Sequence, residues 1–177
     1  MSIRYIISDI KQASMSDSFS SWIKTIIVSP SAHLLILFRV GQSVSQIPVI
    51  GRLFGVVLEY AIRLLYASDI SLKARVEPGL VIVHGHDIVI GADVKIGKNC
   101  KIFNGVTLGN KDVFTSSKGN QPTIYDDVVI CTGAKILGPV SVGSASLVGA
   151  NSVLLVDCPA NSVAVGVPAK IIDRNHD

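Results

Sequence analysis

The sequence has little net charge and few cysteines. The low charge argues against nucleic-acid binding, and the cysteine pattern argues against an oxidising compartment. A net charge of +3 over 177 residues is too small to indicate a nucleic-acid partner, and no basic stripe is interleaved with aromatic residues. The 3 cysteines are an odd number and lack CxxC spacing, which favours a reduced, cytoplasmic compartment. A composition of 49% hydrophobic residues is nevertheless enough for one domain with a buried core and an appendage.

The N-terminal part also lacks a clean apolar run of the length that a membrane span needs. Residues 25–44 and 49–66 are apolar, but charged residues such as Arg39 interrupt them. We therefore predict amphipathic helices, with a helix start at 29–31 and a break at 46–51. The first residues show no secretory signal. An alternative is that an apolar helix face contacts the inner surface of a membrane as a peripheral attachment.

What the sequence has instead is a six-residue period in its second half. Over residues 90–109 and 124–152, an aliphatic residue opens each unit and a small or β-branched residue takes the fifth place. This period fits neither an α-helix nor a half-buried strand, and it is typical of a parallel β-helix whose coils stack these side chains in a continuous core. The first places are taken by Ile90, Ile96, Ile102, Leu108, Ile124, Ile130, Ile136, Val142 and Val148.

The same period gives the domain organisation. Because the pattern extends upstream to Ile70, we predict an N-terminal α-helical region over residues 1–68 and a solenoid over 69–172. A loop at 110–123 interrupts the solenoid, and a short tail follows at 173–177. The predicted fold class is therefore mainly β, with a helical appendage.

One step of the period is irregular. The interval from Ile82 to Ile90 is eight residues instead of six, so two extra residues bulge within His84-Gly85-His86-Asp87. Regular coils only need to stack, and function in a repeat protein is usually attached where the repeat is broken. Spacing alone, however, leaves a structural role for His84 open.

Residues 69–172 carry a set of motifs with a shared spacing: Asp69-Ile70, His84, 88–91, 106–109, 133–138, 149–153 and 166–171. Through these motifs the chain resembles the hexapeptide acyltransferases, and within them the serine acetyltransferase group, whose shorter relatives include capsule and exopolysaccharide O-acetyltransferases. The resemblance implies a left-handed β-helix, an acetyl-CoA-dependent O-acetyltransferase activity and a homotrimer with acetyl-CoA in the groove between neighbouring solenoids. Whether such trimers pair is left open.

The resemblance implies a role for several residues. His84 matches the general base, which must take a proton from an acceptor hydroxyl near neutral pH. Asp69 matches the carboxylate that orients the imidazole, and backbone N–H groups around Gly109 and Asn110 match donors for the oxyanion. His86 has the same strand parity as His84, so it is a candidate for substrate binding, although a surface role is equally open.

A cofactor site is predicted farther along the solenoid. Small residues in the coils from Thr132 and Gly133 to Ala150 leave flat walls along which the pantetheine arm of acetyl-CoA fits. Lys170 is a candidate donor to a phosphate of the coenzyme, with a solvated tail lysine as the alternative.

The departures from the serine acetyltransferases suggest a different acceptor. Val83 stands where the family has an Asp, and Asn120 and Gln121 stand where it has the Arg-His pair that grips the carboxylate of serine. A carboxylate gains most from a fixed guanidinium, so we predict a neutral sugar hydroxyl of a capsular or exopolysaccharide glycan as acceptor, with Asn120 and Gln121 among the substrate-binding residues.

Three alternatives remain open. The first is serine O-acetylation in cysteine biosynthesis. The second is a γ-type carbonic anhydrase, which needs three His ligands around zinc, whereas only His84 and His86 lie in the predicted solenoid, so we expect no metal. The third is a non-catalytic solenoid that acts as an assembly scaffold.

Overall fold

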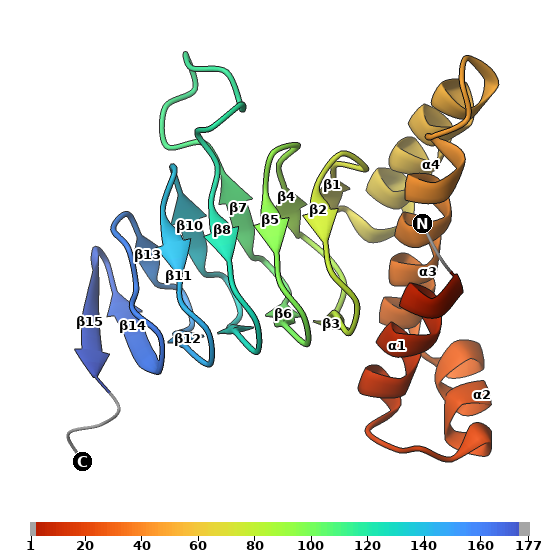
Figure 1. Cartoon of the computed structure of the whole chain (residues 1–177), viewed down its shortest axis with the longest axis horizontal. Helices are drawn as coiled ribbons and strands as arrows, with labels where there is room; N and C mark the ends of the chain where they lie inside the picture. The colour runs from red at the N-terminus through yellow and green to blue at the C-terminus, as the bar shows by residue number, and fades with distance from the viewer. Residues whose placement is uncertain (1–2, 174–177) are drawn as a thin grey trace.

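The computed structural model describes residues 3–173, in which four helices lie together at one end of a β-solenoid (Figure 1). The helices occupy the predicted N-terminal region, and the first two were not predicted as separate helices from the sequence. Their bounds are α1 Ile3–Ser14, α2 Phe19–Val28, α3 Pro30–Val44 and α4 Ile50–Tyr66.

The predicted helix start at residues 29–31 is correct. Ser29 caps α3, its hydroxyl accepting a hydrogen bond from the Ala32 amide at 3.3 Å, and Pro30 takes the first helical position, where it has no amide to leave unpaired. Within residues 3–173 no single helix is long and apolar enough to cross a membrane. The pair α2 and α3, bent by 89°, meets the length and composition criteria only when both are taken together.

The solenoid is a parallel β-helix of about five coils whose short strands form three sheets of five, four and six strands, and the last strand, β15, pairs antiparallel with β14. Sheet A contains β1 Asp69–Ile70, β4 Val89–Ile90, β7 Thr107–Gly109, β10 Lys135–Leu137 and β13 Val153–Leu154. Sheet B contains β2 Arg75–Val76, β5 Lys95–Ile96, β8 Thr123–Ile124 and β11 Ser141–Val142. Sheet C contains β3 Val81–Val83, β6 Lys101–Phe103, β9 Val129–Ile130, β12 Leu147–Val148, β14 Ser162–Gly166 and β15 Ala169–Asp173.

The residues that repeat every six positions form the core of this solenoid. First-place residues stack directly on one another, as Ile90 does on Ile70 and on Leu108, and all of them are buried. Fifth-place residues such as Cys100 complete the core, and burial raises the pKa of the Cys100 thiol to about 11. The fold class predicted from the period is therefore confirmed. Of the predicted tail 173–177, the structure describes only Asp173, which is the last residue of β15. Residues 174–177 lie outside the described residues.

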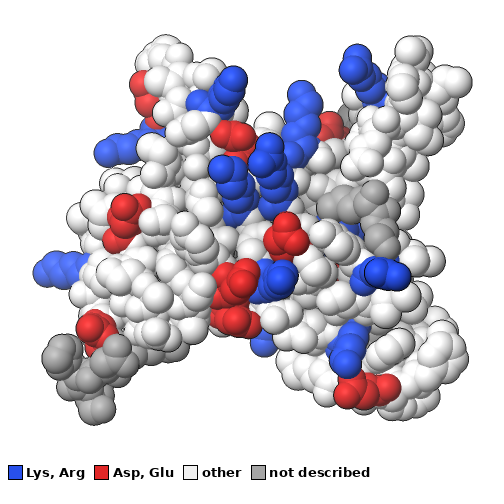
Figure 2. All heavy atoms as spheres, viewed as in Figure 1, with Lys and Arg blue, Asp and Glu red and all other residues white. Residues whose placement is uncertain are grey.

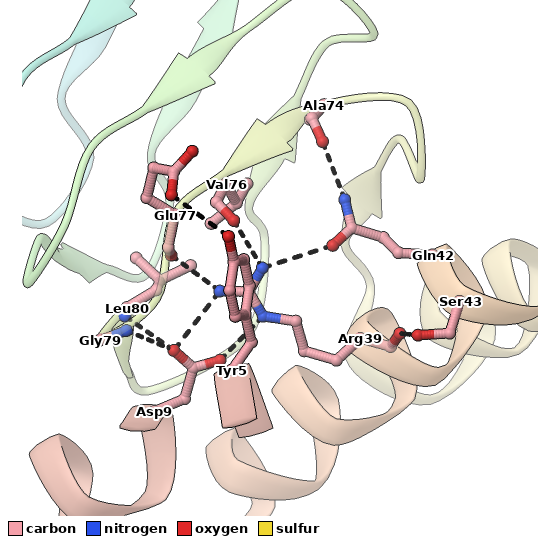
Figure 3. Close-up of polar contacts among 10 residues, drawn as sticks. All are labelled: Tyr5, Asp9, Arg39, Gln42, Ser43, Ala74, Val76, Glu77, Gly79 and Leu80. Carbon is pink, nitrogen blue, oxygen red and sulfur yellow. Dashed lines mark hydrogen bonds and ion pairs between the residues drawn. The ribbon is translucent and has the colours of Figure 1, made fainter. Parts of the chain in front are cut away.

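A buried ion pair fastens the helices to the first coil (Figure 3). The Arg39 guanidinium donates to Asp9 at 2.8 Å and to the backbone oxygens of Val76 and Glu77 at 2.6 and 2.9 Å. The Asp9 carboxylate also accepts from two backbone amides of the coil, those of Gly79 and Leu80. Burial raises the pKa of Asp9, while the guanidinium and the amides act in the opposite direction. Both side chains are only 2% exposed, so each depends on the other.

Candidate active site

The corner between sheets C and A carries the bulge. In each coil, one residue with positive φ turns the chain at this corner. From coil to coil these residues are Asp87, Gly105, Gly133 and Asn151, and their φ angles are 55°, 71°, 70° and 55°. The stack is held by backbone hydrogen bonds in which the Gly105 amide donates to the carbonyl of His86 and the Gly133 amide to that of Asn104. His86 is therefore in register with the next coil, and the residues inserted before it are His84 and Gly85.

The inserted His84 has a left-handed backbone. Its φ is 54°, a conformation that the regular coils do not need at this place and that His, like Asn and Asp, adopts more often than other non-glycine residues. Such conformations cost on the order of 1–3 kcal/mol and cluster at functional sites. The insertion is held in place by α3, because the Ser31 hydroxyl accepts a hydrogen bond from the Gly85 amide at 3.0 Å.

The bulge opens into a cavity of about 720 Å³ between the solenoid and the helices. Both His84 and His86 are exposed at its wall, so the structure brings these two predicted residues together. The opposite wall comes from the start of α3 and the end of α4. The remaining lining residues are Pro30, Ser31, Leu64, Leu65, Tyr66, Ala67, Gly85 and Asn104. The cavity is therefore mostly apolar, with two imidazoles at one side.

Asp69 is paired with a cation that the sequence did not point to. Its carboxylate accepts from the Arg63 guanidinium of α4 at 2.7 Å, and both side chains are more than half exposed. The Asp69 carboxylate raises the pKa of Arg63. No hydrogen bond joins Asp69 to His84 among the described residues, so the orienting contact implied by the family resemblance is not formed in this single chain. Arg63 lies in the last turn of α4, directly before the residues that line the cavity.

The predicted oxyanion donors lie at a different corner. Gly109 ends β7 and Asn110 begins the loop that joins sheet A to sheet B, which projects away from the solenoid (Figure 1). His84 precedes sheet A, whereas Gly109 and Asn110 follow it. One chain therefore does not bring the predicted base and the predicted oxyanion donors into one place.

Asn120 and Gln121 anchor this loop. The Gln121 side chain accepts from the Asp93 amide and donates to the Asn110 side chain, both at 2.8 Å, and the Asn120 side chain donates to the backbone oxygen of Ser116 at 2.9 Å. Their amides are thus used within the loop and its base. These contacts explain both residue types without any reference to an acceptor.

The predicted cofactor residues share the corner of the bulge. Thr132 and Gly133 lie two coils beyond His84, and Ala150 lies three coils beyond it, about 14 Å along the corner at the usual strand spacing. The Thr132 hydroxyl donates to the backbone oxygen of Asn104, which lines the cavity. Lys170 is exposed on β15, opposite Val165 in the antiparallel pair at the end of sheet C.

Sequence reasoning missed Ser31 and Tyr66, which line the cavity, and Arg63, which pairs with Asp69. All three lie within α3 or α4, where the hexapeptide period gives no register. Across residues 3–173, no three His, Cys, Asp or Glu side chains form a group that could hold a metal ion.

A parallel β-solenoid of hexapeptide coils with a histidine bulge on one corner defines a hexapeptide-repeat acyltransferase, and the comparisons with known proteins name the family. The serine acetyltransferase of Helicobacter pylori strain J99 is 33% identical over 154 residues, which are 86% of this chain and 86% of that protein. The serine acetyltransferase of Synechococcus elongatus is 36% identical over 155 residues, which are 86% of this chain and 61% of the relative. No family model matches the chain.

Solved structures agree. The serine acetyltransferase of Neisseria gonorrhoeae superposes with a TM-score of 0.86 at 28% identity, covering 98% of this chain and 67% of that one. A serine acetyltransferase in complex with CoA gives 0.84 at 29% identity over 96% of this chain and 69% of that one. A soybean serine acetyltransferase with bound serine gives 0.85 at 29% identity over 96% and 68%.

This chain belongs to the serine acetyltransferase family. The left-handed β-helix and the acyltransferase class predicted from the sequence are confirmed by this membership. The chain spans less than two thirds of the length of the Synechococcus relative.

The predicted sugar acceptor is wrong. The relatives and structural neighbours are serine acetyltransferases, and polysaccharide biosynthesis finds no support among them. The error came from Asn120 and Gln121, which were interpreted as a pocket for neutral hydroxyls. Gln121 bonds to Asp93 and Asn110, and Asn120 bonds to the backbone of Ser116, so their lack of charge says nothing about the charge of the acceptor.

Proposed function

We propose that this chain transfers the acetyl group of acetyl-CoA to the hydroxyl of L-serine. The observation that carries the proposal is the two-residue insertion that places His84 at the wall of a cavity, on the same corner as the small residues of the later coils. Solved relatives with CoA and with serine, similar over 96% of this chain, support the two substrates.

In the proposed reaction, His84 accepts the proton of the serine hydroxyl while the serine oxygen attacks the thioester carbonyl. The tetrahedral intermediate then collapses, the bond to sulfur breaks, and the imidazolium returns its proton to the departing thiolate of CoA. The proton balance closes without a covalent enzyme intermediate. General-base catalysis of this kind typically contributes ~10²–10⁴ in rate.

The oxyanion donors of the proposed site come from a second copy. Because the amides at Gly109 and Asn110 follow sheet A and His84 precedes it, a neighbouring solenoid must bring its own loop to the bulge. The homotrimer predicted from the family resemblance provides such a neighbour. Acetyl-CoA would then lie along the corner from His84 past Thr132 to Ala150.

Arg63 is the cation that we assign to the serine carboxylate. A guanidinium binds a carboxylate with two parallel hydrogen bonds, and Arg63 already binds one, that of Asp69, beside the cavity. Lys135 also lies near this corner, but its ammonium donates to the Gly105 carbonyl and the Thr107 hydroxyl. When the serine carboxylate binds the Arg63 guanidinium, the Asp69 carboxylate loses this partner and can accept a hydrogen bond from the His84 imidazole.

The test is thiol release from acetyl-CoA by the purified chain with L-serine as acceptor, with mass spectrometry of the product. We expect serine-dependent release and a product heavier by one acetyl group. The matched panel replaces L-serine by D-serine, glycerol and neutral mono- and oligosaccharides, which lack its charges or their arrangement. Turnover of a sugar without turnover of L-serine would refute the proposal.

A further inference from the structure

The loop of residues 110–121 carries two apolar side chains at its outer end. Val113 and Phe114 are 84% and 94% exposed, whereas every other residue from 110 to 121 is polar, charged or glycine. The loop stands clear of the solenoid at the top of Figure 1, and Figure 2, in the same view, shows its outer end mostly free of charged side chains. Neither side chain therefore contributes to the core of its own chain.

Hydrogen bonds hold the outer end of the loop in a turn. The Asp112 carboxylate accepts from the Phe114 amide at 2.9 Å, and the Asp112 carbonyl accepts from the Thr115 hydroxyl, also at 2.9 Å. The Asn110 side chain donates to the carbonyl of Thr115 at 2.9 Å. This turn keeps Val113 and Phe114 away from the rest of the chain, so a partner for them has to come from another molecule.

The loop leans over the coil of β10. Lys111 lies against Gly138, and a cavity of about 490 Å³ under the loop is lined by loop residues together with Gly138 and Pro139, which directly follow β10. Thr132 and Gly133 lie just before β10, at the other edge of sheet A. Copies related by an axis parallel to the solenoid keep each coil at one height. The loop of one copy is then level with Thr132 and Gly133 of the next.

At that height the proposed site needs a second wall. Acetyl-CoA, placed with its thioester at His84, passes Thr132 about 10 Å along the corner, at the usual strand spacing over two coils. Small side chains line the corner on one side of its pantetheine arm. The arm consists of methylene and amide groups and ends in a dimethyl group, and apolar side chains fit such a surface. Val113 and Phe114 belong to the same loop that supplies Gly109 and Asn110 to the proposed site.

We propose that Val113 and Phe114 of a second copy of this chain form the outer wall of the acetyl-CoA groove and pack against the pantetheine arm. The loop then acts at two places, with its base at the thioester and its outer end on the arm. This inference rests on the proposed function for the coenzyme and for the neighbouring copy, but it does not depend on serine as the acceptor.

The first measurement is calorimetric titration of the full chain with CoA, in which Phe114→Ser is compared with Lys118→Ser. Both variants place the same side chain at an exposed position of the loop, one at its apolar end and one beside it. Burial of a Phe side chain changes a dissociation constant by about 10- to 100-fold. We therefore expect Phe114→Ser to raise the Kd for CoA by about tenfold or more, and Lys118→Ser to keep it near that of the wild type. The unfolding temperatures of the three proteins should agree, since neither side chain is buried.

A cross-link tests which copy supplies the side chain. Cys131 is a free, half-buried cysteine directly before Thr132. We expect Phe114→Cys to be joined to Cys131 of a second copy by a short bis-maleimide, which gives linked chains on a denaturing gel. Saturating CoA, which lies between the two thiols in the proposed site, should prevent the link. The control is the double variant that also carries Cys131→Ala, and it should not link.

Equal CoA affinities for the wild type and Phe114→Ser would overturn the proposal. The absence of linked chains in Phe114→Cys, or their persistence after Cys131→Ala, would overturn it as well. If CoA binding and the cross-link behave as expected but the chain does not acetylate L-serine, the acceptor in the proposed function is wrong and the contact of the loop with the coenzyme stands.

Discussion

The solenoid and the helical region have similar apolar sequences, yet they bury them very differently. In the solenoid each first-place residue meets its equivalent in the next coil, and residues such as Ile102 and Leu108 are 0% exposed. In α4, Leu53 and Leu64 are 68% and 72% exposed. A repeat supplies the partner for each side chain within its own chain, whereas an amphipathic helix must find a partner elsewhere. The difference teaches that a repeat buries its apolar side chains within one chain, whereas one face of α4 stays exposed in it.

The two regions also use polar groups differently. The hydroxyls of the solenoid core, such as that of Ser152, bond to the backbone of a neighbouring coil. The helices share an apolar core cluster with the solenoid, and they are also joined to it by polar side chains that bond to its backbone. The buried pair of Asp9 and Arg39 bonds to the first coil, and Ser31 accepts from the Gly85 amide. The helical wall of the His84 cavity is therefore held by apolar packing together with these hydrogen bonds.

The largest effect is expected when the buried Asp9–Arg39 pair between the helices and the first coil is broken. We expect Asp9→Ala to lower the free energy of unfolding by ~3–5 kcal/mol, because it leaves the Arg39 guanidinium buried without its counter-ion. Urea unfolding followed by circular dichroism measures the change. The control is Asp17→Ala, which removes the exposed partner of Lys11 and should change stability little. Equal effects of the two substitutions would show that the junction does not hold the helices.

A smaller effect, on the KM for L-serine, is expected at Arg63 of α4, which pairs with Asp69 at the start of the solenoid. Arg63→Ala should raise the KM for L-serine by about tenfold or more while the KM for acetyl-CoA is unchanged, because a charged hydrogen bond to the acceptor is lost. Arg63→Lys should recover part of the loss, since it restores the charge without the fork. Steady-state kinetics with each substrate varied in turn gives both constants. A KM for serine within twofold of the wild type would remove Arg63 from the site.

The hexapeptide period allowed the solenoid to be predicted from the sequence, because each first-place residue has only to be apolar and six residues from the next. The bulge was found in the same way, as an interruption of that period. The left-handed backbone that this insertion imposes on His84 was not evident, since His is enriched at positive φ but occurs far more often in other conformations.

The contacts between the regions were beyond sequence reasoning. Asp9 and Arg39 are 30 residues apart on two helices, and nothing in their local sequence pairs them. Arg39 was interpreted only as a charge that interrupts an apolar stretch. Asn120 and Gln121 were assigned to the acceptor because their types were compared with a family motif, without knowledge of the hydrogen bonds that hold their loop. Local pattern predicts local structure well, but the use of a polar side chain is decided by what the fold places beside it.

The central claim is that His84 is the general base for acetyl transfer to serine, and His84→Asn tests it most directly. Asn tolerates the left-handed backbone that His84 adopts, so the bulge should keep its shape. We expect serine-dependent thiol release to fall by ~10²–10⁴, while binding of acetyl-CoA, measured by calorimetry, and the unfolding temperature stay near those of the wild type. Turnover within a few-fold of the wild type would contradict the claim.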